Sequence, residues 1–268
     1  MLTKNNFLRS VLLTFIASTS MSYAETTTWN FATGSGNYDV DNSGNAFGNE
    51  LSIDSDDDGT AELTIQAWAD TGCGWNCDPD DQVQQGFAST NSGGLLNYNL
   101  DTPTGTDPLT GEEHVIDNRD DVDMMFFSFS ESTALTGIDI GWYSGDTDIS
   151  IAAFSSMPTL SGNTWVNIVG QSIFSASFSN LGSAPYSLAN EVSGAVVEAK
   201  YWLIGAYSSV FGDSGANDNS SDKFKLASIT TKITKTIPKP PSEVSEPSTI
   251  AMLASIGLFL MWRRKKTA

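Results

Sequence analysis

Residues 61–69 read AELTIQAWA, and the side chains of this stretch fall into two alternating sets. One set comprises Leu63, Ile65, Ala67 and Ala69, and the other comprises Glu62, Thr64, Gln66 and Trp68. Successive side chains of a β-strand point to opposite faces, so this period of two is typical of a strand with one buried face. The stretch therefore predicts a half-buried strand that follows an acidic turn.

Short apolar segments of the same kind, separated by Gly, Asn, Asp and Ser, occur along most of the chain. They are residues 27–31, 51–53, 124–129, 135–143, 149–154, 164–169, 172–178, 201–207 and 224–233. No segment of this region has a long apolar stripe with the helical period of 3.6 residues. The pattern predicts an all-β fold, a single β-sandwich with jelly-roll-like connections that covers residues 25–236.

The N-terminus has the features of a secretory signal peptide. Lys4 and Arg9 precede the short apolar stretch VLLTFIA at residues 11–17, and Ser22 and Ala24 place small residues where signal peptidase cleaves. The apolar stretch is too short to span a bilayer about 30 Å thick. We expect signal peptidase to remove residues 1–24 and the remaining chain to be exported.

The C-terminus has three parts. Residues 237–248 form a proline-rich linker, and residues 249–262 carry no charged side chain. Arg263, Arg264, Lys265 and Lys266 follow directly, and such a basic cluster stays on the cytoplasmic side of a membrane. A helix of this apolar stretch is only about 21 Å long, so residues 249–268 predict a short transmembrane helix that holds the protein transiently in the inner membrane.

This tail resembles the PEP-CTERM sorting signal of Gram-negative bacteria, which combines a Pro-Glu-Pro-like motif, a short hydrophobic helix and a basic end. The motif here is Ser245-Glu246-Pro247, so serine replaces the first proline, and Arg263 and Arg264 begin the basic end. The resemblance implies that the tail is processed by an exosortase, a membrane enzyme with a catalytic cysteine. A plain C-terminal anchor is the alternative.

Several separated blocks are similar to a PEP-CTERM subfamily known as exosortase-dependent surface proteins. The blocks are HVIDN at residues 114–118, Asp123 with FFSF, GW at 141–142, DTDIS at 146–150, YWLIGAY at 201–207 and KFKLA at 223–227. The similarity implies a secreted protein at the cell surface or in the extracellular matrix of a biofilm-forming bacterium. No enzymatic role is established for that subfamily, so the similarity gives no enzymatic activity to expect here.

Acidic residues dominate the chain, with 32 Asp and Glu against 13 Lys and Arg and a net charge of −19. All of the acidic residues and only seven of the basic ones lie within residues 25–247. This charge excludes nucleic acid as a partner, because phosphate binding needs clustered Lys and Arg. It also opposes adhesion to anionic polysaccharide unless a cation bridges the two.

The densest polar segment, residues 54–62, reads DSDDDGTAE and begins like a calcium-binding loop. Alternate carboxylates and a glycine suit such a loop, but the position that would supply a bidentate glutamate in an EF-hand is Ile65. We therefore expect a looser calcium site with four candidate ligands, Asp54, Asp56, Asp58 and Glu62. An acidic hairpin turn without an ion is the alternative.

A second acidic stretch, residues 112–123, precedes an apolar strand. Together with Asp146 and Asp148, and with the aromatic residues Trp142 and Tyr143 nearby, it predicts a cation or glycan site on loops at one edge of the fold. The same residue types also form ordinary turns.

Cys73 and Cys77 are the only cysteines of the chain. In an exported protein this close pair predicts a disulfide that closes a small loop, with free thiols as the alternative. A zinc site would need further ligands, and His114 is the only histidine.

These features together predict an exported, non-enzymatic protein of the cell surface or matrix that binds calcium or extracellular polysaccharide. Two alternatives remain open. One is a secreted carbohydrate-active hydrolase that uses two carboxylates, and the other is a purely structural matrix component.

Overall fold

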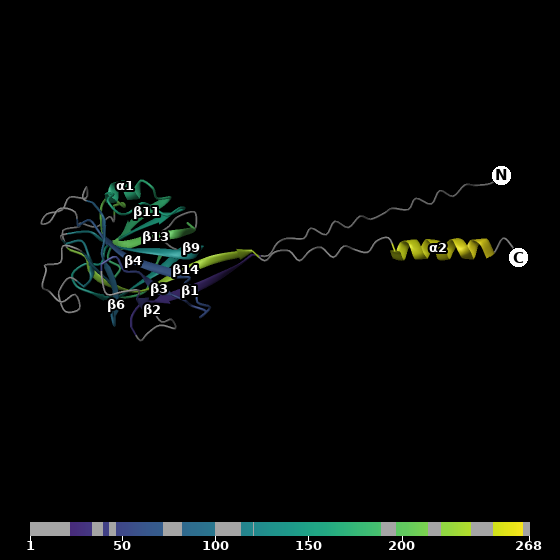
Figure 1. Cartoon of the computed structure of the whole chain (residues 1–268), viewed down its shortest axis with the longest axis horizontal. Coiled ribbons are helices and arrows are strands. Elements are labelled where there is room, and N and C mark those ends of the chain that lie inside the picture. The colour runs from purple at the N-terminus through teal and green to yellow at the C-terminus, as the bar shows by residue number, and fades with distance from the viewer. Residues whose placement is uncertain are drawn as a thin grey trace. The chain divides into compact units, whose positions relative to one another are not determined.

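The computed structural model describes residues 22–33, 40–42, 47–71, 82–99, 114–119, 121–188, 197–213, 221–236 and 249–264 (Figure 1). Ala24–Thr234 forms one compact unit, and the described residues outside it belong to a second unit. The regular structure of the first unit is almost entirely antiparallel β-strand, which confirms the predicted all-β class.

The centre of the sheet is β9 (Asp123–Tyr143), a strand of 21 residues. Its first half pairs with β4 (Leu63–Ala69) and β13 (Ala199–Ala206). Its second half pairs with β14 (Lys223–Thr236) and β12 (Tyr186–Ser187). The two separate strands predicted at 124–129 and 135–143 are therefore one continuous strand, because the polar residues between them keep the extended conformation.

The remaining strands extend the sheet on both sides of β9, in the order β11-β10-β13-β9-β14-β7-β6 along its main path. Their bounds are β1 Ser22–Asn30, β2 Val40–Asn42, β3 Leu51–Ile53, β5 Gln84–Gln85, β6 Phe87–Asn91, β7 Gly94–Tyr98, β8 Ile116–Asp117, β10 Ile149–Phe154 and β11 Phe174–Phe178. β1, β3, β10 and β11 overlap predicted segments, whereas β2, β5, β8 and the β6–β7 hairpin were not predicted.

Both faces of the first half of β9 are buried. Met125, Phe127 and Phe129 belong to the main apolar cluster, and Met124 and Phe126 belong to a second cluster on the other face. In β4, Leu63, Ile65, Ala67 and Ala69 are fully buried as predicted, and Thr64 and Gln66 on the other face are partly exposed. Trp68, assigned from the sequence to the polar face, is also buried, because the second cluster covers that face.

The strand predicted at residues 164–169 is wrong: the segment forms the short helix α1 (Trp165–Val169). Thr164 caps it, since its hydroxyl accepts a hydrogen bond from the backbone N–H of Asn167 at 3.2 Å. Trp165 and Ile168, three residues apart, are both buried in the second apolar cluster. The cap and this packing outweigh the β-propensity of the valines and isoleucine.

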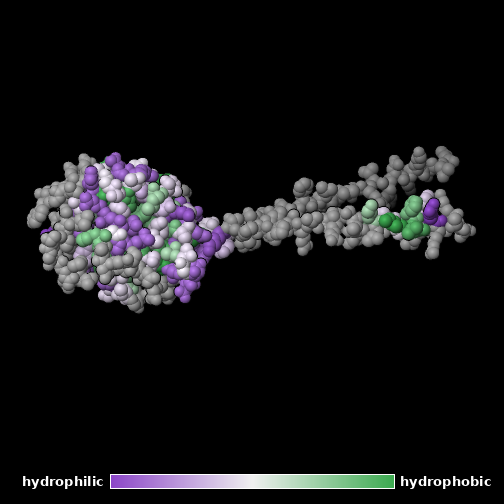
Figure 2. Space-filling model, in the orientation of Figure 1, coloured by the Kyte–Doolittle hydropathy of each residue, from purple (hydrophilic) through white to green (hydrophobic). Residues whose placement is uncertain are grey.

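A second helix, α2 (Thr249–Arg264), covers the predicted hydrophobic segment and ends at the first two basic residues. Its exposed apolar side chains include Phe259 and Leu260 (Figure 2). Within the part of the chain that the structure describes, no helix has the length and apolar character needed to span a membrane.

Candidate functional site

The acidic segment 54–62 forms the connection of the β3–β4 hairpin. Antiparallel pairing of Ile53 with Leu63 holds its two ends side by side. Both of these residues are fully buried in the main apolar cluster, so the hairpin has a rigid base. The polar residues between them are partly or fully exposed. The fold therefore presents a loop of carboxylates on a fixed support.

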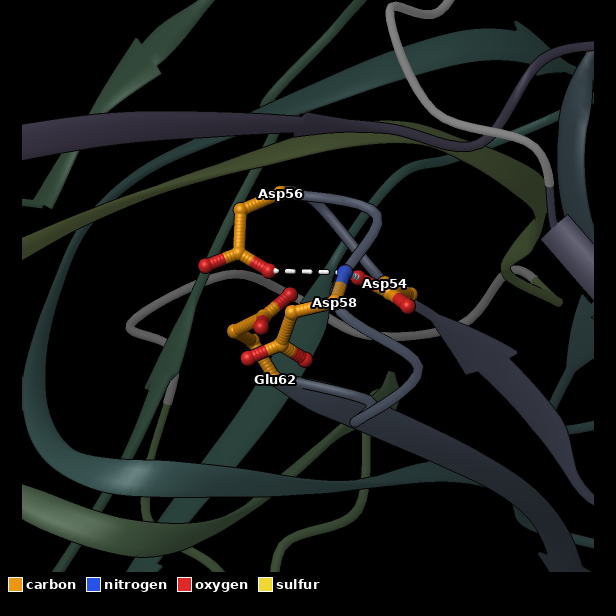
Figure 3. Close-up of side chains that lie close together, drawn as sticks. All are labelled: Asp54, Asp56, Asp58 and Glu62. Carbon is orange, nitrogen blue, oxygen red and sulfur yellow. Dashed lines mark hydrogen bonds between the residues drawn. The ribbon is translucent and has the colours of Figure 1, made fainter.

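The four predicted ligands meet in this loop. Carboxylate oxygens of Asp54, Asp56, Asp58 and Glu62 lie within 4.8 Å of one another (Figure 3). Ile65, at the position where an EF-hand has its glutamate, is fully buried in β4 and points into the core. The structure thus agrees with the exclusion of an EF-hand and brings together the looser set of ligands.

Backbone amides fix the shape of the loop. The N–H of Gly59 donates to Asp54 Oδ2 at 2.7 Å, and the N–H of Asp58 donates to Asp54 Oδ1 at 3.2 Å and to Asp56 Oδ1 at 3.3 Å. The sharp turn uses left-handed backbone conformations at Asp57 and Gly59, with φ of 61° and 86°. Ser55 adds a further hydrogen bond across the loop, in which its hydroxyl donates to Glu62 Oε2 at 2.8 Å.

The pKa values of Asp54 and Asp56 are shifted in opposite directions. Desolvation raises the pKa of Asp54, but backbone hydrogen bonds, from Gly59 first, outweigh it, so this pKa lies below its ordinary value. The pKa of Asp56 is raised by desolvation and by the charges of Asp58 and Glu62. Four convergent carboxylates repel one another, and a cation among them would relieve that repulsion.

A second group of carboxylates comprises Asp146, Asp148 and Asp222, whose oxygens also lie within 4.8 Å of one another. Asp148 and Asp222 are fully buried. Asp222 Oδ1 accepts from the N–H of Asp148 at 2.7 Å, and its Oδ2 accepts from Asn118 Nδ2 at 2.7 Å. Asn118 therefore connects the predicted 112–123 stretch with residues 146–148, through its hydrogen bond to Asp222. Asp222 was missed, since nothing local in the sequence marks it.

The acids of the predicted 112–123 stretch that the structure describes form a separate buried group with Asp70. Asp117, Asp121 and Asp123 are each less than 7 % exposed. Asp123 accepts hydrogen bonds from Asn97 Nδ2 at 3.0 Å and from the N–H of Asp117 at 3.3 Å. Burial, followed by the charge of Asp117, raises the pKa of Asp123 well above its usual range. The residues of the predicted second site therefore lie in two separate groups, one around Asp222 and one around Asp123.

Several predicted residues lie outside the described part of the chain. They are the cysteine pair Cys73 and Cys77 and the sorting motif Ser245, Glu246 and Pro247. Arg263 and Arg264 are the last two residues of α2. The disulfide and the sorting motif stay predictions.

Comparison of the chain with protein-family models, with curated proteins and with solved structures gives no match.

Proposed function

We propose that the chain is an exported, non-enzymatic surface protein whose β3–β4 hairpin binds calcium. The observation that carries the calcium assignment is the convergence of Asp54, Asp56, Asp58 and Glu62 within 4.8 Å. Calcium is a hard cation that takes six to eight oxygen ligands, which carboxylates, backbone carbonyls and water supply. Extracellular modules of this type bind calcium at ~0.1–1 mM.

The fold assigned to the body in this proposal is a single β-sandwich with jelly-roll-like connections. The composition of the main apolar cluster supports it. Ile65 and Phe127, from the strands around the first half of β9, share that cluster with Ile138 and Leu226, from the strands around the second half. Two layers that enclose one core are the usual solution for such antiparallel strands.

Delivery to the surface rests on the two ends of the sequence. Signal peptidase removes residues 1–24, and an exosortase processes the tail that carries the motif Ser245-Glu246-Pro247 while α2 holds the protein in the inner membrane. The length of α2, 16 residues ending at Arg263 and Arg264, supports a transient anchor. The product is then released to, or attached at, the cell surface or extracellular matrix of a Gram-negative bacterium.

Calcium also gives the acidic body a way to contact matrix polysaccharide. Residues 25–247 carry a large excess of negative charge, which repels an anionic polymer. A calcium ion at the hairpin would neutralise part of the local charge and keep coordination positions for sugar oxygens.

The test is calcium-dependent melting of the purified body, residues 25–236. At about 10 mM calcium, linkage predicts a rise in Tm of about 3–8 °C over the value in chelator. Asp56→Ala should abolish this rise. It should also raise Tm slightly in chelator, because it relieves the repulsion that Asp58 and Glu62 exert on Asp56.

Asp213→Ala is the matched control, since it removes the same charge from an exposed position elsewhere. It should leave the calcium response intact. Equal melting of the unaltered protein in calcium and in chelator contradicts the calcium site, and an equal loss of response in both variants shows only a general charge effect.

A further inference from the structure

Lys225 is the most enclosed basic side chain among the described residues of this acidic body. It lies on β14 between Phe224 and Leu226, which point into the main apolar cluster, so its own side chain points to the opposite face of the sheet. It is only 9 % exposed. Burial lowers the pKa of Lys225, and no carboxylate of the described residues offsets that effect. A desolvated ammonium of this kind favours an anionic partner.

Trp142 provides a flat apolar surface beside this ammonium. The two residues are register partners on β9 and β14, and Lys225 Nζ lies 5.3 Å from the centroid of the Trp142 ring. Trp142 is nevertheless 43 % exposed, which is unusual for the largest aromatic side chain. The β6–β7 turn borders both: a Cβ at Gly93 would lie 3.0 Å from Lys225 Cδ and 3.3 Å from Trp142 Cβ. The turn therefore limits the freedom of both side chains.

His114 adds a second polar group near Lys225. Its ring stacks on Tyr98 at 6.4 Å between centroids, and its Nδ1 is buried without a hydrogen-bond partner among the described residues. Burial and the charge of Lys225 lower the pKa of His114, so the imidazole is neutral at pH 7. Lys225 therefore supplies the positive charge beside Trp142, and the neutral imidazole of His114 adds none.

We infer that Lys225 and Trp142 form a binding site for a uronate, a sugar unit that carries one carboxylate. The ammonium pairs with the carboxylate, and the apolar C–H face of the pyranose ring packs on the exposed part of the indole. The inference rests on the proposed function, since it names the class of polysaccharide unit that the surface protein contacts. It places that contact on a site separate from the calcium hairpin.

The experiment measures binding of methyl glucuronide and methyl glucoside to the body by ligand-observed NMR in chelator. The two sugars differ only in the carboxylate, and the chelator keeps calcium out of the result. We expect the glucuronide to bind about tenfold more tightly than the glucoside. Lys225→Met should remove this preference, Lys225→Arg should retain it, and Trp142→Ala should weaken binding of both sugars.

Two matched variants serve as controls. Lys232→Met removes the same charge elsewhere on β14, and Phe47→Ala removes an aromatic side chain of similar exposure in another segment of the body. Both should bind the glucuronide normally, and the melting temperature of every variant shows whether it is folded.

Equal binding of the two sugars overturns the inference, as does an equal loss of binding in Lys225→Met and Lys232→Met. Binding of N-acetylglutamate as tight as that of the glucuronide also overturns it, because the site would then recognise an acidic peptide as well. Failure here leaves the calcium response of the hairpin unaffected, so the two proposals are judged separately.

Discussion

The carboxyl group of Asp123 is enclosed by other acids at the start of β9. Its oxygens accept hydrogen bonds from Asn97 Nδ2 and from the backbone N–H of Asp117. Burial raises the pKa of Asp123, and the charges of Asp117, Asp121 and Asp70 raise it further. The folded protein therefore keeps a proton on Asp123 at pH values where the unfolded chain has released it.

This proton makes the stability depend on pH in a defined direction. A folded-state pKa above the unfolded value gives stability that is complete below about pH 4 and is lost as the pH rises through the folded pKa. Asp117→Asn removes the largest charge acting on Asp123 and keeps the Oδ1 that accepts the N–H of Arg119. We expect the variant to gain about 1 kcal/mol over the unaltered protein between about pH 4 and pH 7.

Urea unfolding across this pH range measures the difference. Asp213→Asn, at an exposed position, is the control and should show a constant offset from the unaltered protein. If the difference between Asp117→Asn and the unaltered protein does not change with pH, Asp123 is not protonated in the folded state.

At the scale of single residues, local spacing predicted the candidate calcium ligands of the hairpin, whereas the acids of the second group are brought together by pairing between distant segments. Asp54, Asp56 and Asp58 stand two apart before a glycine, and one hairpin turn brings them together with Glu62. Asp222 reaches Asp148 across 74 positions of the chain. Such contacts depend on the order of strands in the sheet, which no local pattern encodes.

Helix α1 shows how a cap and two buried side chains decide the conformation of a short element. The Thr164 hydroxyl satisfies the N–H of Asn167, one of the amides that the first helical turn leaves without a backbone partner. Trp165 and Ile168 then pack into the second apolar cluster. Val166, on the opposite side, is 48 % exposed.

Thr164→Ala should therefore lower the free energy of unfolding by about 1 kcal/mol, as measured by urea denaturation. Thr164→Ser keeps the hydroxyl and should cost much less. Equal destabilisation by the two variants would contradict the capping role, because only the alanine variant removes the hydrogen-bond acceptor.

The sequence predicted the individual strands well where apolar residues alternate and poorly where they do not. β3 and β10 coincide with the predicted segments 51–53 and 149–154. β9 was divided in the prediction because Ser130, Glu131 and Ser132 are polar, and they are indeed exposed while remaining in the strand. β7 reads GLLNY, and Gly94 and Asn97 interrupt its apolar residues, so no alternation marks it and the strand was missed.

For the whole molecule, the proposed export rests on two features, the acidic charge of the body and the sequences of the two terminal segments. The described strands account for a stable, highly charged body, and the basic residues of the tail lie outside it. The proposed export would account for both features, since a strongly charged body stays soluble outside the cell and a short apolar segment followed by basic residues serves delivery. Under the proposed function, the body acts through calcium and sugar contacts.

The most direct test is the identification of both ends of the mature protein by mass spectrometry after cell fractionation. We expect surface or matrix material that begins at Glu25 and lacks the peptide containing Trp262, and we expect deletion of residues 247–268 to abolish that delivery to the surface. Surface material that retains the Trp262 peptide indicates a plain anchor instead of processing. A native chain found in the cytosol with both ends intact contradicts the account.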